Sequence, residues 1–119
     1  MNTRTRFRLD ATALDRAAGV LLAAAAGDAL GVPYEFASRV PDLPQMIGGG
    51  LGPYAPGEYS DDTQMAACIA EVAAIGADLT APQVIDQIAD RFIAWKSDGA
   101  SDIGISTRAA LTGVEPGPG

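Results

Sequence analysis

The chain has 119 residues, 48% of them apolar and 19% charged, with a formal net charge of −7 at pH 7. This length suits one domain, and the apolar fraction argues against wholesale disorder. The sequence has no histidine and one cysteine, Cys68. This composition excludes histidine-based triads and metal sites, internal disulfides and cysteine-pair zinc sites. Chemistry on this chain therefore depends on carboxylates, hydroxyls and backbone groups.

The charge is spread unevenly along the chain. Residues 1–16 are net positive, with Arg4, Arg6, Arg8 and Arg16 against Asp10 and Asp15, whereas the remainder is strongly acidic. An acidic body argues against nucleic acid as a partner and is compatible with binding a divalent cation. The basic arm lacks aromatic residues and a high density of Lys and Arg, so we interpret it as a frayed terminus rather than a nucleic-acid-binding tail.

Residues 17–26, AAGVLLAAAA, follow this arginine-bearing start and superficially resemble a signal peptide. Asp10 and Asp15 lie where a signal peptide is positively charged, and the apolar run is mostly alanine. The run is also too short to span a bilayer. We therefore expect a cytoplasmic, reduced protein with no membrane partner. The alternative is a small secreted helical protein that uses residues 1–26 as its signal.

The first predicted helix covers residues from about Ala11 to Ala29. It is rich in alanine and carries apolar residues three and four positions apart: Leu14, Ala18, Leu21, Leu22 and Ala25. The small residues in its second half suit close packing against other helices. From Gly31 to Tyr59, closely spaced prolines and glycines predict a long helix-free stretch. A loop of this length is usually functional or disordered.

Three further helices are predicted after this loop. The first follows Ser60-Asp61-Asp62 and ends near Gly76, with Met65, Cys68, Ile69, Val72 and Ile75 on its buried face. In the next, Thr80 is the expected cap, Pro82 the first helical residue and Gln83 the partner in a capping box. Its buried stripe is Val84, Ile85, Ile88, Ala89, Phe92 and Ile93, with Trp95 near its end. Asp102 opens a last short helix that runs to about Leu111. No segment alternates with period two, so the predicted fold class is all-α.

Ser60, Asp61 and Asp62 are three consecutive oxygen donors at the start of a predicted helix. One interpretation is a helix N-cap, since Ser and Asp are favoured there and the helix dipole attracts negative charge. A cap needs only one such residue, and the remaining carboxylate oxygens are free to converge on a ligand. Without histidine or paired cysteines, that ligand would be a hard cation such as Mg²⁺, Mn²⁺ or Ca²⁺.

Other candidate residues are weak when taken singly. Glu35 lies at the mouth of the long loop and would by itself be an ordinary surface residue. Asp28 is a charge in an alanine-rich helix, so it either pairs with an arginine or lies beside a site. Asp102 follows Gly99 and looks like another helix cap. The glycine-rich run at residues 48–52 lacks the strand-loop-helix context of a phosphate-binding loop, so we interpret it as a flexible loop.

The order of these residues is more informative than each alone. Gly27-Asp28-Ala29-Leu30-Gly31 with Glu35 comes first, and Ser60-Asp61-Asp62-Thr63-Gln64-Met65 follows. Asp102-Ile103-Gly104 with Thr107-Arg108-Ala109-Ala110-Leu111 comes last. This arrangement resembles the N-terminal part of the ADP-ribosylglycohydrolase family over residues 17–112. We therefore divide the chain into a basic arm and helix start (1–16), the N-terminal part of an ADP-ribosylglycohydrolase-like domain (17–112) and a Gly/Pro tail (113–119).

The resemblance implies an all-α metal-dependent hydrolase with a dinuclear Mg²⁺ or Mn²⁺ centre at the bottom of a cleft. Such enzymes remove ADP-ribose from modified side chains such as arginine or serine, or hydrolyse related small ADP-ribosyl compounds. By the same resemblance, Ser60, Asp61 and Asp62 match the first group of metal ligands, and Glu35 and Asp102 match catalytic acidic residues. Carboxylates suit this chemistry because cleavage at the anomeric carbon develops positive charge on the ribose.

Two departures from the family pattern affect what we expect. Ile105 stands where the family commonly has an asparagine, which would remove hydrogen bonds to a ligand. The family's remaining metal ligands lie in a C-terminal Gly-Asp-x-Asp-Thr block that this sequence lacks. We expect an incomplete N-terminal fragment that is marginally stable and a poor catalyst by itself, arising from an incomplete or frameshifted gene. The alternatives are a split enzyme whose C-terminal half is a separate chain, and a non-catalytic ADP-ribose-binding or interaction module of the same fold.

Overall fold

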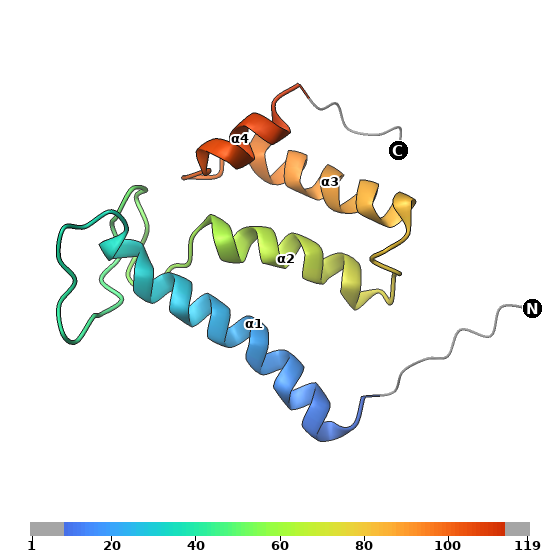
Figure 1. Cartoon of the computed structure of the whole chain (residues 1–119), viewed down its shortest axis with the longest axis horizontal. Coiled ribbons are helices and arrows are strands. Elements are labelled where there is room, and N and C mark those ends of the chain that lie inside the picture. Colours follow the sequence, from blue (N-terminus) through green and yellow to red (C-terminus); the bar gives the residue numbers. More distant parts are fainter. Residues whose placement is uncertain (1–8, 114–119) are drawn as a thin grey trace, which may run out of the picture.

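A computed structural model describes residues 9–113 (Figure 1). Within this range the chain forms four α-helices, one short 3-10 helix and no strand. The elements are α1 (Ala11–Gly31), η1 (Val32–Tyr34), α2 (Asp61–Ala74), α3 (Pro82–Ser97) and α4 (Ile105–Leu111). The predicted all-α class is confirmed for this part of the chain. Residues 1–8 of the predicted basic arm and 114–119 of the predicted tail lie outside the described residues.

Helix α1 is capped by Asp10, whose carboxylate Oδ1 accepts a hydrogen bond of 2.7 Å from the backbone N of Ala13. The helix contacts α2, and Figure 1 shows that its N-terminal half diverges from α2. Ala29 is the only buried residue of α1, so the expectation that this helix packs closely along its second half is wrong for most of its length. Leu14, Val20 and Leu22 are instead exposed.

The segment Ala11–Tyr34 has 24 residues and a mean hydropathy of 1.4, and by length and composition it is able to cross a membrane. The ten-residue run considered in the sequence is too short to do so, but the helix that contains it is not. Only 11% of the apolar window of this helix is buried. Core helices of soluble proteins and signal sequences meet the same criterion, so the finding is weak evidence for a membrane span.

Helices α2 and α3 pack side by side (Figure 1). Val72 of α2 and Val84 of α3 are buried, and the indole Nε1 of Trp95 donates a 2.7 Å hydrogen bond to Oε1 of Gln64. An ion pair between Arg91 and Glu71 also links the two helices. The predicted apolar stripes are too wide, because Ile75 and Ile85 are 74% and 52% exposed.

Two predicted helix starts are wrong by a few residues. Helix α3 has Ala81 as its N-cap residue, with Pro82 first as predicted, but Thr80 does not cap it. The Thr80 hydroxyl instead donates to Oδ1 of Asp78 at 2.7 Å. Helix α4 begins at Ile105 with Gly104 as its N-cap residue, so Asp102 does not open it. Lys96 of α3 connects to the end of α4 by donating to the backbone O of Leu111 at 3.3 Å.

The long connection between η1 and α2 is folded back onto the end of α1. The Tyr34 hydroxyl fixes one part of it, donating to the backbone O of Gln45 at 3.0 Å and accepting from the backbone N of Gln45 at 2.9 Å. Gly50 has φ of 74°, and a Cβ there would lie 2.3 Å from the backbone O of Val32. The glycine-rich run therefore allows close backbone packing, and its residues do not line the cavity described below.

Candidate functional site

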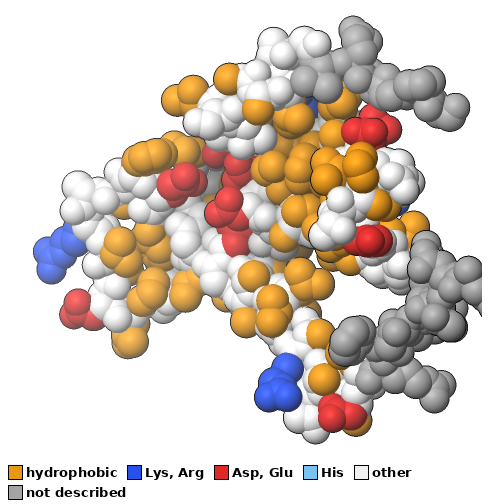
Figure 2. Space-filling view, turned by 45° about the vertical axis from the view of Figure 1, so that its right-hand side comes forward, with side chains coloured by type: hydrophobic (Ala, Val, Ile, Leu, Met, Phe, Trp, Pro, Cys, Tyr) orange, Lys and Arg blue, Asp and Glu red, His pale blue; other side chains and the backbone are white. Residues whose placement is uncertain are grey.

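A cavity of about 1010 Å³ opens between α1, α2 and the start of the long connection. Its polar lining comes from residues of four segments: Asp28, Tyr34, Glu35, Ser60, Asp61, Asp62, Thr63 and Thr107. Figure 2 shows acidic side chains gathered near the centre of one face, with hydrophobic side chains on both sides. The cavity is large enough for a nucleotide-sized ligand.

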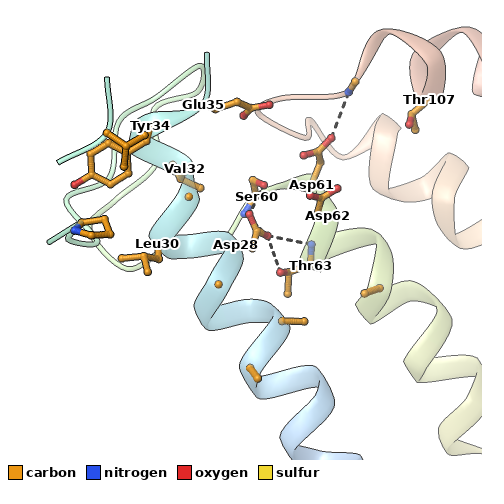
Figure 3. A pocket seen from close by; sticks show the side chains of 18 residues that line it. Asp28, Leu30, Val32, Tyr34, Glu35, Ser60, Asp61, Asp62, Thr63 and Thr107 are labelled. Atoms are coloured by element: carbon orange, nitrogen blue, oxygen red, sulfur yellow. Dashed lines mark hydrogen bonds between the residues drawn. The ribbon is translucent and has the colours of Figure 1, made fainter. Parts of the chain in front are cut away.

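Asp28, in the last turns of α1, ties that helix to the start of α2 (Figure 3). Its Oδ2 accepts hydrogen bonds from the backbone N of Ser60 at 2.9 Å, the backbone N of Thr63 at 3.1 Å and the Thr63 hydroxyl at 2.6 Å. Its Oδ1 accepts from the Ser60 hydroxyl at 2.5 Å. No arginine is involved, so of the two alternatives for Asp28, the position beside a site is the correct one.

These hydrogen bonds control the ionisation of Asp28. Burial by itself raises the pKa of this carboxyl, but the four hydrogen bonds from Ser60 and Thr63 outweigh it and lower the pKa below 3.8. Hydrogen bonds to the charged form of an acid always favour that form. Asp28 is therefore a fixed negative charge at neutral pH, with its lone pairs already directed to α2.

Ser60 occupies the N-cap position of α2, as the sequence predicts, but its side chain makes no capping hydrogen bond. A capping side chain normally accepts from the backbone N–H of the second or third helical residue. Here Asp28 accepts from the third one, Thr63, and so caps α2 from another helix. This substitution leaves the lone pairs of the buried Ser60 hydroxyl free of the capping role.

Asp61 and Asp62 are the first two residues of α2, so the positive end of the helix dipole favours their ionised forms. Oδ2 of Asp61 accepts a 3.3 Å hydrogen bond from the backbone N of Gly104, which connects this turn to the segment before α4 (Figure 3). Thr107 of α4 also lines the cavity. The sequence placed the acidic turn correctly at a helix start but gave no role to Thr63 or Thr107.

Glu35 follows η1 and extends toward the same space as Asp61 and Asp62 (Figure 3). Burial, followed by the negative charges of Asp102, Asp61, Asp62 and Asp28, raises the pKa of Glu35 above 4.5. The residues that the sequence singled out are therefore brought together electrostatically. Asp102 acts on Glu35 through its charge but is not among the residues that line the cavity.

The donors fit a hard cation in type but not in number. Ser60, Asp61 and Asp62 offer only oxygen, which Mg²⁺ and Mn²⁺ prefer. Among residues 9–113, however, no three His, Cys, Asp or Glu side chains are arranged to hold a metal ion. Asp28 cannot add the missing ligand because its oxygens already accept four hydrogen bonds. This turn can therefore supply part of a coordination shell, with the remaining ligands coming from water or from elsewhere.

Ile105 is 90% exposed and does not line the cavity. The sequence-based expectation that an apolar residue here removes buried hydrogen bonds to a ligand is therefore wrong for this arrangement. Tyr54 is a residue that the sequence reasoning missed. It lies in the glycine-rich connection and is one of the few buried large side chains among the described residues.

Comparison with known proteins gives consistent matches. The sequence model of a family described as ADP-ribosylglycohydrolase matches residues 9–118. The ADP-ribosylarginine hydrolase Tri1 of Serratia proteamaculans is 35% identical over 93% of this chain and 31% of its own length. The protein of the same name from Pseudomonas putida is 38% identical over 85% of this chain and 28% of its own length.

A third relative is the ADP-ribosyl-[dinitrogen reductase] glycohydrolase of Rhodospirillum rubrum, 33% identical over 82% of this chain and 34% of its own length. The chain thus spans about a third of the length of the curated relatives it matches. No solved structure gives a significant match.

Proposed function

Because this chain belongs to the ADP-ribosylglycohydrolase family, we propose that its acidic cavity is the N-terminal part of a site that hydrolyses an ADP-ribosyl bond with the help of a divalent cation. The observation that carries the proposal is the turn Ser60-Asp61-Asp62, which Asp28 holds against the cavity together with Glu35. Two of the matched relatives are ADP-ribosylarginine hydrolases, so we propose ADP-ribosylated arginine as the substrate.

In this proposal Ser60, Asp61 and Asp62 hold a Mg²⁺ or Mn²⁺ ion through their oxygens. The resemblance implies a dinuclear centre, and a bound cation would orient ribose hydroxyls and water. The second group of ligands lies outside the residues of this chain, as the family pattern and the short match to its relatives both suggest. The chain by itself therefore binds a cation more readily than it catalyses hydrolysis.

The chain's own carboxylates would do the rest of the chemistry. Asp61, Asp62 and Glu35 bring negative charge to one side of the cavity, where it stabilises positive charge that develops on a ribose during bond cleavage. Glu35 has a raised pKa and a position at the cavity mouth, which suits exchange of a proton with water or a leaving group. Asp102 adds its charge from the neighbouring segment.

Calorimetric titration with Mn²⁺ tests the cation part of this proposal. We expect the 119-residue chain to bind Mn²⁺ and the double variant Asp61→Asn/Asp62→Asn to show no binding. The matched control, Asp15→Asn/Asp86→Asn, removes two negative charges from exposed helix positions outside the cavity and should bind as the parent does. Equal binding by the parent and Asp61→Asn/Asp62→Asn would mean that the turn serves only to start α2.

A non-catalytic ADP-ribose-binding module is the second candidate function. It is favoured by the finding that no three acidic side chains among the described residues are arranged around a metal position. Calorimetry with ADP-ribose separates the two candidates. Binding of ADP-ribose that is the same with and without Mg²⁺ favours the module, whereas binding that requires the cation favours the hydrolase site.

A further inference from the structure

Tyr54 carries a buried hydroxyl that the site described so far does not use. The side chain is 6% exposed, and its ring lies against Gly52, where an added Cβ would be 2.7 Å from Cε2. Tyr54 is held in place by its backbone, because its carbonyl accepts a 2.8 Å hydrogen bond from the backbone N of Gly49. Its hydroxyl oxygen is buried and has no hydrogen-bond partner within residues 9–113.

An unpaired buried hydroxyl is rare in native proteins and requires an explanation. The surroundings of this one are acidic. Burial, followed by the charges of Asp102, Asp61, Asp28 and Glu58, raises the pKa of Tyr54 to about 12. The phenol is therefore protonated at neutral pH and is a hydrogen-bond donor among carboxylates, which are acceptors.

Three of these four carboxylates already receive hydrogen bonds. Asp28 accepts from Ser60 and Thr63, as described above. Asp61 accepts from the backbone N of Gly104, and Glu58 accepts from the backbone N of Ala55 at 2.6 Å. The fourth, Asp102, is half-buried and receives no hydrogen bond from any described residue, and among the charged groups it has the largest effect on Tyr54.

We propose that Tyr54 is a positioning residue whose hydroxyl donates a hydrogen bond to the carboxylate of Asp102, directly or through one buried water. The unmatched donor and the unmatched acceptor then satisfy each other. The segment that carries Asp102 is already fixed on its other side, since Ile103 is buried and the backbone N of Gly104 is bonded to Asp61. The new bond would hold the Asp102 carboxylate in one orientation beside the cavity.

This inference rests on the proposed function only for the catalytic role of Asp102. The hydrogen bond itself is a property of the folded chain and needs neither cation nor substrate. A glycine-rich connection far from any helix thereby gains a reason to bury a tyrosine.

Vibrational spectroscopy of the tyrosine ring tests the proposal, because the ring modes report whether a phenol donates a hydrogen bond. The Tyr54 signal is the difference between the spectra of the 119-residue chain and its Tyr54→Phe variant. The matched control is Tyr59→Phe, which removes an exposed hydroxyl close to the same site. We expect the Tyr54 signal to be that of a strong donor, and the Tyr59 signal to be that of a phenol in water.

The partner is identified by repeating the measurement in Asp102→Ala. We expect the donor signature of Tyr54 to be lost there, and to be weakened in Asp102→Asn, which keeps an acceptor oxygen without the charge. Circular dichroism establishes that each variant is helical, and the Asp102→Asn result decides the matter if Asp102→Ala does not fold. An unchanged Tyr54 signal in a folded Asp102 variant, or no donor signature in the parent, overturns the proposal.

The outcome is independent of whether the chain takes part in hydrolysis. A donor signature that depends on Asp102 in a chain that does not bind cation or ADP-ribose would refute the proposed function and leave this inference intact. Cation binding that depends on Asp61 and Asp62, combined with an unchanged Tyr54 signal in the Asp102 variants, would do the reverse.

Discussion

Asp28→Ala is the substitution with the largest expected effect on the fold. It removes the acceptor of four hydrogen bonds that join the end of α1 to the start of α2. The Ser60 and Thr63 hydroxyls can turn to water or to other acceptors. The backbone N–H groups of the same two residues cannot turn, because they belong to the first turn of a helix and have no partner within that helix.

The magnitude follows from those two backbone donors. A buried donor that loses its partner costs about 1–3 kcal/mol, and both donors here are part-buried, which places each toward the lower end. We therefore expect Asp28→Ala to lower the free energy of unfolding by about 2–4 kcal/mol. Small domains are stable by about 5–15 kcal/mol in total, so this loss is a large fraction.

Urea denaturation followed by far-UV circular dichroism measures this change. The matched control is Asp15→Ala, which removes an exposed carboxylate from the same helix and should change the free energy of unfolding by no more than about 0.5 kcal/mol. If Asp28→Ala were no more destabilised than Asp15→Ala, the hydrogen bonds of Asp28 would contribute nothing to holding α1 against α2, and the reasoning would be refuted.

Three further predictions follow from the same site. The pKa of Asp28 is lowered in the folded chain, so its contribution is fully present above the unfolded pKa near 3.8 and is lost as the pH falls through the folded pKa. The difference in unfolding free energy between the parent and Asp28→Asn should accordingly be constant from pH 7 to about pH 5 and shrink below pH 4, and a constant difference down to pH 2 would contradict this. The pKa of Glu35 is raised by burial and by Asp102, Asp61, Asp62 and Asp28, so its charged form is disfavoured in the folded chain. Glu35→Gln should therefore be at least as stable as the parent at pH 7, with the advantage disappearing below about pH 4, and a variant less stable than the parent at pH 7 would show that the charges do not oppose one another. Gly50→Ala should be more destabilising than Gly49→Ala in urea denaturation. Both glycines have positive φ, which costs an alanine about 1–2 kcal/mol, but only at Gly50 would the Cβ also meet the backbone O of Val32, at 2.3 Å. Equal losses would mean that the connection does not pack on Val32 as described.

Helix positions and the acidic turn could be predicted from the sequence because both depend on local patterns. Alanine content and apolar spacing locate α1, and Pro82 marks the start of α3. The order of the acidic motifs along the chain indicated the family, and the comparisons confirm it.

Capping partners could not be predicted, because they depend on residues distant in the sequence or on competing local bonds. The Ser60 hydroxyl bonds to Asp28, 32 residues earlier, and not to its own helix. The Thr80 hydroxyl finds Asp78 first, which removes it from the capping box.

Burial was over-predicted for a related reason. An apolar stripe shows which face of a helix suits a core, but not whether another element covers it. Among the described residues, Ile75, Ile85 and Leu22 are exposed although they fit the helical periodicity. Tyr54 could not be singled out, since a tyrosine in a loop rich in glycine and proline carries no local signal that its hydroxyl is buried among carboxylates.

The most direct test of the central claim is hydrolysis by a chimeric enzyme. Residues 9–118 of this chain would replace the matching segment of the ADP-ribosylarginine hydrolase of Serratia proteamaculans, which retains its own remaining two thirds. We predict that the folded chimera releases ADP-ribose from ADP-ribosylarginine in the presence of Mg²⁺ or Mn²⁺, whereas the 119-residue chain alone does not. Asp61→Asn/Asp62→Asn should reduce the rate of the chimera by more than about 100-fold, since even outer-shell changes at metal sites cost 10–100-fold, and Asp15→Asn/Asp86→Asn should leave it unchanged. A folded chimera that binds ADP-ribose without hydrolysing the substrate, or one whose rate does not depend on Asp61 and Asp62, would contradict the claim.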